Sequence, residues 1–384
     1  MLFFSHLQTA VNLLQAYQGE EPFHLFIKKY FKAHPQHGSR DRRSIMHLCY
    51  GAFRLGKSAQ DRSLEEQVLT GYFLCNQSPA ALLDKLKPGW NNKIKEPLYQ
   101  KLGLVEPPID LSQIFPWKDE LSASVDHQQL ILSYFQQPLV FLRVRPGKEG
   151  LVRPLLENIS HEWIDQSCVA VENNTRLSEL LPLNSAVVVQ DRSSQALGQL
   201  LKMVPAKPKL SVWDCCAASG GKTLLVADQW PDAQIAVSDI RPAILKNLEV
   251  RMQEAGVKLM NKWVIDLAAE KPSLPANVFD LIVADVPCTG SGTWGRNPEQ
   301  LFYFEQKKIT EYADLQARLL QTATRRLKPG GYLLYSTCSL FHQENEDQIN
   351  ALVKEGDWTL IRQELFAGYG HRADSLFGAL LQRS

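Results

Sequence analysis

The stretch from Lys209 to Trp230 constrains the fold of this chain more than any other and reads KLSVWDCCAASGGKTLLVADQW. Residues 210–213 form a short apolar run typical of a buried strand. Small residues fill positions 217–221, and an apolar-periodic helix is predicted to begin near Lys222. A strand, a tight turn and a helix N-terminus in this order let backbone N–H groups approach a polar or anionic ligand. The stretch therefore predicts an α/β domain that binds a ligand at this turn.

Three interpretations of the turn compete. The Walker A loop of ATPases ends in Gly-Lys-[Ser/Thr], and Gly221-Lys222-Thr223 matches that end. Cys216 stands where this loop needs its first glycine, so the phosphate cradle does not close in the same way. Asp285 follows an apolar run and is placed like a Walker B acid. This stretch alone is compatible with three interpretations: the turn of a P-loop-like ATPase, a turn that binds S-adenosylmethionine, and an ordinary tight turn.

Length and composition describe an ordinary globular protein. The chain has 384 residues, enough for two or three domains, with 45% hydrophobic and 22% charged residues. The net charge of +1 carries no information about partners, but its distribution does. Between Lys28 and Lys57 eight Lys or Arg residues stand against one acid, Asp41. This stretch is either a solvated helix face or a surface that follows a phosphate backbone.

The cysteines and the hydropathy indicate a reducing compartment. The seven cysteines are odd in number and lack a C-x-x-C pair, which argues against disulfides and structural zinc. The N-terminus lacks the pattern of a signal peptide, and no apolar run approaches membrane-spanning length. We expect a cytoplasmic, monomeric protein without a metal ion and without a membrane partner.

The chain divides into three predicted domains. Residues 1–120 show helical apolar spacing and end in a proline-rich segment, so we expect a helical domain. Residues 121–205 alternate short strand-like and helical runs, with Arg143 and Arg145 near the first strand, and predict a small α/β module. Residues 206–384 alternate strands and helices, which predicts a mostly parallel sheet.

Polar residues recur where the predicted strands of the last domain end. Three of these strands end in an aspartate and one ends in Ser336-Thr337-Cys338; the aspartates are Asp239, Asp266 and Asp285. A single such aspartate is more often a helix cap. Their recurrence favours a binding site, because open α/β sheets bind ligands at the carboxyl ends of their strands.

Two cysteines follow neighbouring strands, Cys288 after Asp285 and Cys338 after Thr337. A lone cysteine after a strand is more often a small buried residue. Two of them, each beside a hydroxyl residue, favour covalent catalysis. C5 of a pyrimidine is a poor nucleophile, but a thiolate that adds at C6 turns the ring into an enamine whose C5 attacks a methyl donor. The C5 proton and the thiol must then leave, which requires a second acid/base group.

These motifs resemble the cytosine-5 RNA methyltransferases of the Sun/Nol1/Nop2 type, from Pro138 to the C-terminus. The resemblance rests on segments at 189–195, 216–223, 285–290, 296–299, 337–339 with 344–346, and 374–381. It implies a Rossmann-like class I methyltransferase sheet with S-adenosylmethionine as cofactor. It also implies a cofactor site of Cys216, Ala217, Ala218, Ser219, Gly220, Gly221, Lys222, Asp239, Asp266 and Asp285.

The resemblance assigns roles within this set. Residues 216–222 would hold the methionine part, Asp239 the ribose hydroxyls, and Asp266 would lie by the adenine. Cys338 would be the nucleophile and Cys288 the group that helps release product, with Asp285 and Lys222 in the catalytic group. Position alone leaves the order of the two cysteines open. Ser219 departs from the family, which usually has proline there.

The N-terminal region resembles the NusB-like RNA-binding domain fused to bacterial ribosomal members of the family, mainly over residues 41–54. This favours a phosphate-binding surface, with RNA contacts expected at Arg42, Arg43, Arg54, Arg143 and Arg145. The implied substrate is 16S ribosomal RNA, with transfer RNA as the alternative. An ATPase and a non-catalytic RNA-binding protein are the competing classes.

Overall fold

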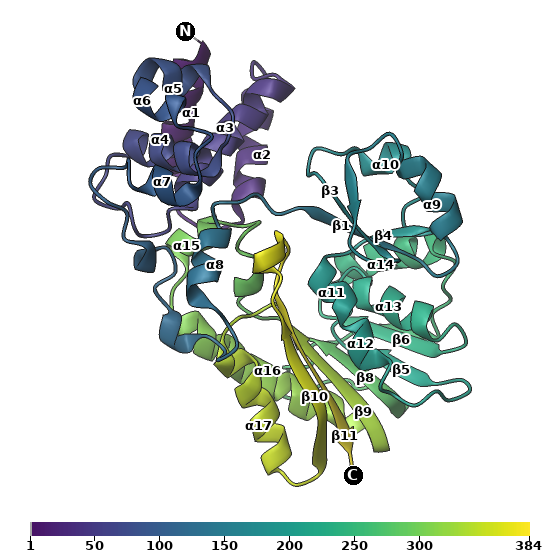
Figure 1. Ribbon diagram of the computed structural model, residues 1–384. Helices are drawn as coiled ribbons and strands as arrows, with labels where there is room; N and C mark the ends of the chain where they lie inside the picture. Colours follow the sequence, from purple (N-terminus) through teal and green to yellow (C-terminus); the bar gives the residue numbers. More distant parts are fainter. Residues whose placement is uncertain (1) are drawn as a thin grey trace. The chain divides into compact units, whose positions relative to one another are not determined.

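The computed structural model describes residues 2–384, which divide into two compact units. The helical unit takes in the chain up to Asp119, Asp126–Gln137 and Thr293–Glu305. The catalytic unit takes in Glu120–Val125, Pro138–Gly292 and Gln306–Ser384. Each unit is described by itself below (Figure 1). Within residues 2–384, no helix combines the length and apolar character needed to cross a membrane.

The helical unit is built from α-helices joined by short turns. Its helices are α1 Leu2–Ala16, α2 Phe23–Ala33, α3 Ser39–Phe53, α4 Leu64–Cys75, α5 Ala81–Leu86, α6 Pro88–Asn92, α7 Leu98–Leu102, α8 His127–Ser133 and α15 Glu299–Tyr303. Helices α3 and α4 approach closely because glycines face each other. A Cβ atom on Gly71 would lie 2.1 Å from the carbonyl oxygen of Gly51, so only glycine fits there.

Segment Thr293–Glu305 lies in sequence between two strands of the catalytic unit but packs in the helical unit. The ring of Tyr303 lies 5.1 Å from that of Tyr17, centroid to centroid. The buried Glu299 side chain accepts a hydrogen bond from the N–H of Phe23 at the start of α2 (3.1 Å). The segment therefore supplies both aromatic packing and a polar partner to the helical core.

The small α/β module forms a four-stranded sheet of its own. Its elements are β1 Val140–Val144, α9 Glu149–Leu156, β2 His161–Trp163, β3 Cys168–Val171, α10 Leu177–Leu180 and β4 Val187–Val189. The strand order is β2-β3-β1-β4, with antiparallel pairing of β2 with β3, β3 with β1 and β1 with β4. Its apolar core includes Leu142, Val152, Leu156 and Val169.

The catalytic sheet has seven strands in the order β10-β11-β9-β8-β5-β6-β7. Its elements, with the helices that precede and join them, are α11 Arg192–Ala196, α12 Gly198–Leu201, β5 Ser211–Asp214, α13 Gly221–Gln229, β6 Gln234–Asp239, α14 Pro242–Glu254, β7 Asn261–Val264, β8 Phe279–Asp285, α16 Lys307–Ala323, β9 Leu327–Thr337, α17 Glu346–Lys354, β10 Trp358–Phe366 and β11 Leu376–Arg383. The pairs within β7-β6-β5-β8-β9 are parallel, while β9-β11 and β11-β10 are antiparallel.

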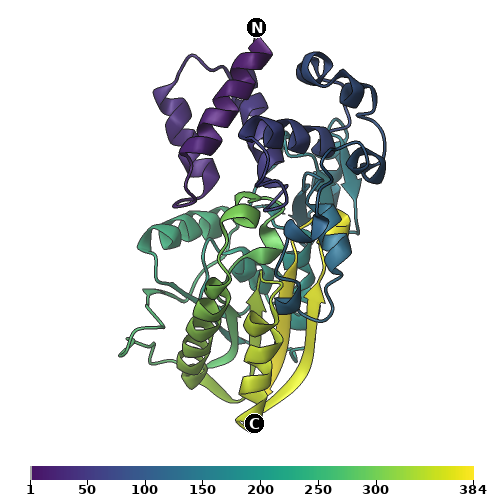
Figure 2. The ribbon, with the colours of Figure 1, turned by 90° about the vertical axis from the view of Figure 1, so that its left-hand side faces the viewer.

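Both faces of this sheet are buried, which explains the continuous apolar runs in its sequence. Val212 packs into a core layer with residues of α12, α13 and α14, and the next residue, Trp213, packs into a second layer with residues of α16 and α17. The alternation reflects the two-residue period of a strand. Figures 1 and 2 show α16 and α17 beside the C-terminal strands. The sheet, its helices and the strand ends agree with the predicted Rossmann-like class I fold.

Candidate active site

A cavity of about 550 Å³ opens at the carboxyl ends of β5, β6 and β8. It brings together most of the residues that the sequence singled out. Those that line it are Cys216, Ala218, Asp239, Asp266, Asp285, Cys288 and Cys338. An apolar wall completes it, with Ile240, Ile265, Leu267 and Leu315. The volume lies within the range of small-molecule sites in proteins.

The glycine loop between β5 and α13 has a strained shape that its small residues permit. Ala218 has φ of +45° and Gly220 has φ of +85°. The positive φ of Gly220 favours glycine, and a Cβ atom there would lie 2.7 Å from the terminal methyl group of Met252, which would have to move. The N–H of Ala217 donates to the carbonyl of Ser238 (2.9 Å), which ties the loop to β6.

Ser219, where the family usually has proline, lies on the outside of this loop. Its side chain is exposed, and Arg251 donates to its carbonyl oxygen (3.3 Å) and to its hydroxyl (3.4 Å). Ser219 is absent from the residues that line the cavity. The departure therefore changes the outer side of the loop.

Asp239 lies at the end of β6 and links the loop to the cavity. Its carboxylate accepts hydrogen bonds from the N–H of Ala218 (3.0 Å) and from Arg241, through the backbone N–H and Nε at 2.9 Å each and a terminal nitrogen at 3.1 Å. Burial alone would raise the pKa of Asp239, but the Arg241 hydrogen bonds outweigh it and lower the pKa. The side chain is therefore a carboxylate at neutral pH. No pattern in the sequence indicated the Arg241 contact.

Lys222 and Asp285 form an ion pair across the start of the cavity. The ammonium of Lys222 lies 2.6 Å from Asp285 Oδ2, and the hydroxyl of Ser336 donates to Asp285 Oδ1 (2.9 Å). Lys222 is at the first turn of α13 and Asp285 at the end of β8. The carboxylate of Asp285 compensates the positive charge of Lys222. This carboxylate is partly exposed and lines the cavity.

Sequence reasoning missed the acid beneath the glycine loop. Asp214, the last residue of β5, is fully buried and accepts a hydrogen bond from the hydroxyl of Thr223 (2.6 Å). Burial, with the negative charge of nearby Asp285, raises its pKa to about 7, although the Thr223 hydrogen bond opposes the shift. The strand-end pattern could have found it, because Asp214 occupies the same position on β5 as Asp239 does on β6.

The two cysteines lie in contact. The Sγ atoms of Cys288 and Cys338 are 3.3 Å apart, on the loops that follow β8 and β9. The N–H of Gly292 donates to the carbonyl of Cys338 (2.8 Å) and joins the two loops. The hydrogen bond to Cys338, followed by burial, raises the pKa of Cys288 well above its usual value. Cys288 therefore keeps its proton beside Cys338.

Three of the five arginines predicted to bind RNA have structural roles instead. Arg54 is only 4% exposed, and its guanidinium donates to the carbonyls of Tyr134, Gln136 (3.3 Å) and Gly295 (2.8 Å). Carbonyl oxygens at the ends of loops need donors when they are buried, and Arg54 supplies them. The prediction for Arg54 was wrong because the local sequence shows its charge but not its partners.

The prediction that Arg143 and Arg145 contact RNA is corrected for the same reason. Both form ion pairs with Asp228 of α13, and Arg143 also donates to Gln190 (2.7 Å). These contacts fix the small module to the catalytic sheet. In the helical unit, by contrast, Arg43 is exposed and Arg42 is partly exposed over the ring of Phe31. Arg42 and Arg43 remain predicted RNA contacts.

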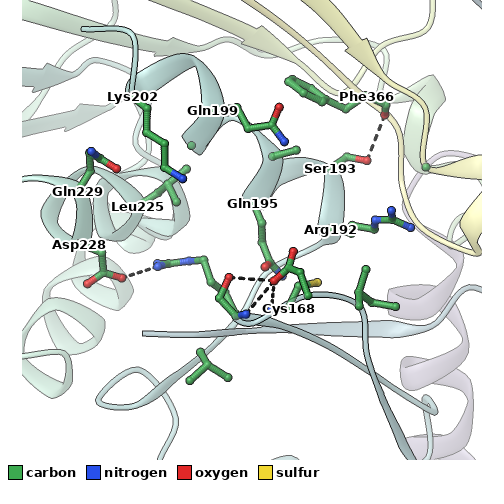
Figure 3. A pocket seen from close by; sticks show the side chains of 18 of the residues that line it. Cys168, Arg192, Ser193, Gln195, Gln199, Lys202, Leu225, Asp228, Gln229 and Phe366 are labelled. Carbon is green, nitrogen blue, oxygen red and sulfur yellow. Dashed lines mark hydrogen bonds and ion pairs between the residues drawn. The ribbon is translucent and has the colours of Figure 1, made fainter. Parts of the chain in front are cut away.

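A second, larger cleft of about 780 Å³ lies between the small module, α11–α13 and the residues after β10. Figure 3 shows side chains that line it, among them Asp228, and the hydrogen bond from the hydroxyl of Ser193 to the carbonyl of Phe366. Asp228 forms an ion pair with Arg143. Its charged side chains include four acids, Glu149, Asp165, Asp228 and Glu364. Cys288, Cys338 and the glycine loop do not line this cleft. The smaller cavity is therefore the candidate active site, because the chemical groups converge there.

Comparisons with known proteins indicate a family for this region of the chain. The sequence profile of the family described as 16S rRNA methyltransferase RsmB/F matches residues 199–376. Ribosomal RNA small subunit methyltransferase B of Xanthomonas campestris pv. campestris is 35% identical over 191 residues, which is 49% of this chain and 42% of the relative. A probable enzyme of the same name from Synechocystis is 36% identical over 172 residues, 44% of this chain and 38% of the relative. The match thus spans about two fifths of the length of these relatives.

Solved structures share the fold at low identity. The crystal structure of PH0851 covers 97% of both chains with a TM-score of 0.69 and 20% identity. NSun6 from Pyrococcus horikoshii, solved with SFG, covers 71% of this chain and 99% of its own, with a TM-score of 0.60 and 17% identity. The fold, the motif geometry and the family match agree: residues 199–376 of this chain match the RsmB/F methyltransferase domain and are similar to the Sun/Nol1/Nop2 methyltransferases.

Proposed function

We propose that this chain is an S-adenosylmethionine-dependent RNA cytosine-5 methyltransferase that acts through a covalent adduct between a cysteine and C6 of the base. One observation carries the proposal. Two thiols 3.3 Å apart lie at one end of a cavity that also holds the buried, ionised Asp239. Two adjacent thiols supply a nucleophile and an acid/base group, and the carboxylate supplies an acceptor for a diol.

The cavity residues fit S-adenosylmethionine. Asp239 would accept hydrogen bonds from the ribose hydroxyls, and the apolar wall with Ile265 and Leu267 would face the adenine, beside Asp266. The loop at residues 216–222 would hold the methionine part. The bound cofactor supplies an electrophilic methyl group on a positively charged sulfur. NSun6, which shares the fold, was solved with SFG, an analogue of this cofactor.

The two cysteines would divide the chemistry between them. Cys338 as thiolate forms a bond to C6 of cytosine, and the ring electrons move to C5, which then takes the methyl group. Cys288 accepts the C5 proton while the bond between C6 and the sulfur of Cys338 breaks. The first cause of the raised pKa of Cys288 is its hydrogen bond to Cys338. That cause disappears once Cys338 is bonded to carbon, so the pKa of Cys288 falls, its proton passes to solvent, and the resulting thiolate can take the C5 proton.

The substrate of this proposal is RNA, as the names of the relatives suggest. A cytosine that is flipped out or single-stranded would reach the thiols, and the helical unit with Arg42 and Arg43 would contact the flanking backbone. We favour 16S ribosomal RNA over transfer RNA. Bisulfite sequencing of both RNAs from a deletion strain tests this choice, because the missing methylcytosine identifies the target. The proposal includes a cytoplasmic, monomeric enzyme without a metal ion.

The order of the two cysteines is tested by two variants. Cys338→Ala removes the nucleophile, so we expect neither methylation nor a covalent RNA complex. Cys288→Ala leaves attack and methyl transfer possible but slows elimination by about 10²–10⁴, the usual effect of losing an acid/base group. A methylated covalent complex should then accumulate on denaturing gels.

Other outcomes overturn parts of the proposal. If Cys338→Ala traps RNA and Cys288→Ala does not, the roles are reversed. If both variants stay active and neither traps RNA, the covalent mechanism is wrong. A wild-type protein that binds RNA and S-adenosylmethionine but transfers no methyl group to any tested RNA would favour a non-catalytic RNA-binding protein.

A further inference from the structure

One buried carboxylate contacts both cysteine loops. Glu344 is completely buried, and its side chain accepts four hydrogen bonds. They come from Thr289 Oγ1 (2.5 Å), the N–H of Thr289 (2.9 Å), Ser339 Oγ (2.6 Å) and Gln316 Nε2 (3.0 Å). Thr289 directly follows Cys288, and Ser339 directly follows Cys338. The carboxylate therefore joins the two loops at the residues beside the thiols.

The rest of the network holds Glu344 itself in place. The hydroxyl of Tyr335 donates to the backbone carbonyl of Glu344 (2.6 Å). Gln316, which donates to the carboxylate, also donates to the carbonyl of Pro287 (2.9 Å), the residue before Cys288. A carboxylate fixed at its backbone and bonded to both loops restricts the separation of those loops.

The charge of Glu344 also reaches the thiols. Burial raises the pKa of Glu344, while the donors from Ser339, Thr289 and Gln316 oppose the rise. The negative charge of Glu344 is among the causes that raise the pKa of Cys288. In its ionised form Glu344 thus supports the protonated state of Cys288.

We propose that Glu344 is a positioning residue that sets the distance and orientation of Cys288 and Cys338 by bonding to Thr289 and Ser339. The catalytic purpose of the distance between the two thiols rests on the proposed function. The effect of Glu344 on that distance can be tested without any RNA. The competing explanation is the backbone hydrogen bond from Gly292 to the carbonyl of Cys338, which joins the same two loops. If that bond sufficed, the Glu344 side chain would not affect the thiols.

The test compares Glu344→Gln with Glu346→Gln. An amide in place of the Glu344 carboxylate has one acceptor and brings an N–H₂ donor against the donors of Thr289 or Ser339. Glu346 is the matched control, since it lies on the same turn but its carboxylate accepts from Ser122 (2.8 Å) instead of from a cysteine loop. Diamide oxidises two neighbouring thiols to a disulfide and is itself reduced to the hydrazine. Mass spectrometry after diamide treatment measures the rate at which Cys288 and Cys338 become linked.

We expect the disulfide to form at the same rate in wild type and Glu346→Gln, and at least about tenfold more slowly in Glu344→Gln. The dissociation constant for S-adenosylmethionine should stay within about twofold, since Glu344 does not line the cavity. This unchanged binding shows that the variant is folded. Glu344→Asp, which keeps the charge but shortens the side chain, replaces it if Glu344→Gln fails to fold.

Equal rates in wild type and the Glu344 variant overturn the proposal and leave the Gly292 hydrogen bond as the sufficient link. Equal slowing in the Glu344 and Glu346 variants also overturns it, because the turn rather than the carboxylate would then be responsible. In the methylation assay we expect a lower kcat for Glu344→Gln. If wild type methylates no RNA, the proposed function fails, while the disulfide rates still decide the role of Glu344.

Discussion

Replacing Asp239 tests the cofactor end of the site. Its carboxylate accepts hydrogen bonds from Ala218 and Arg241 and lies on the cavity wall. Asp239→Ala removes a charged acceptor, whose hydrogen bonds contribute about 1.5–3 kcal/mol. The dissociation constant for S-adenosylmethionine should rise by about 10- to 150-fold, since about 1.4 kcal/mol is tenfold. Isothermal titration calorimetry measures this constant directly.

Two further variants separate the contributions of charge and loop shape. Asp239→Asn keeps an oxygen for the N–H of Ala218 but loses the charge, so it should weaken binding less than Asp239→Ala. Arg241→Ala removes a partner that would share the carboxylate with the ribose under the proposed function. The side chain of Arg241 is 61% exposed, and exposed ion pairs contribute at most about 1 kcal/mol. Its effect on affinity should therefore stay within about fivefold.

The reasoning fails if folded Asp239→Ala binds S-adenosylmethionine as tightly as wild type, because Asp239 would then lie outside the cofactor site. It also fails if Arg241→Ala weakens binding as much as Asp239→Ala does, since Arg241 would then hold the cofactor. Thermal unfolding of each variant shows whether the site residues also hold the loop in its strained shape.

Three remaining predictions concern stability and RNA binding. The pKa of Asp214 is raised from 3.8 to about 7 because its protonated form is favoured in the folded state. Its contribution to the free energy of unfolding is therefore fully present below about pH 4 and is lost as pH rises through about 7. Asp214→Asn should flatten that part of the pH dependence in urea unfolding, and an unchanged profile would contradict the assignment. Arg54→Ala should lower the free energy of unfolding by about 1.5–3 kcal/mol or more. Replacing Arg42 and Arg43 should instead reduce the salt dependence of RNA binding with stability unchanged; no change in salt dependence would show that they form a solvated face.

The sheet and the strand-end groups were predictable from local sequence. Continuous apolar runs bounded by polar residues mark strands buried on both faces, and parallel strands bring their carboxyl ends to one edge. Local sequence alone therefore places Asp239, Asp285 and Cys338 near one another. It does not predict the distance between Cys288 and Cys338, because that distance depends on hydrogen bonds between loops 50 residues apart.

The predictions that failed concern arginines whose hydrogen-bond or ion-pair partners lie far away in the sequence. Arg143 pairs with Asp228, 85 residues away, and Arg54 bonds to Gly295, 241 residues away. A local pattern shows only that such a residue carries a charge. The segment Thr293–Glu305 is a similar case, since its sequence neighbours lie in the catalytic sheet while its contacts lie in the helical unit.

The Gly221-Lys222-Thr223 sequence shows how partners decide function where a motif does not. In an ATPase the lysine reaches the phosphates and the threonine binds Mg²⁺. Here the lysine pairs with Asp285 and the threonine hydroxyl bonds to Asp214. The charged side chains that line the cavity are three acids and one arginine, namely Asp239, Asp266, Asp285 and Arg241. With Lys222 paired to Asp285, three acids stand against two cations, and this small negative balance disfavours a triphosphate and favours a cationic sulfonium. Calorimetry should therefore detect S-adenosylmethionine and no MgATP, and the reverse result would return the turn to the ATPase class.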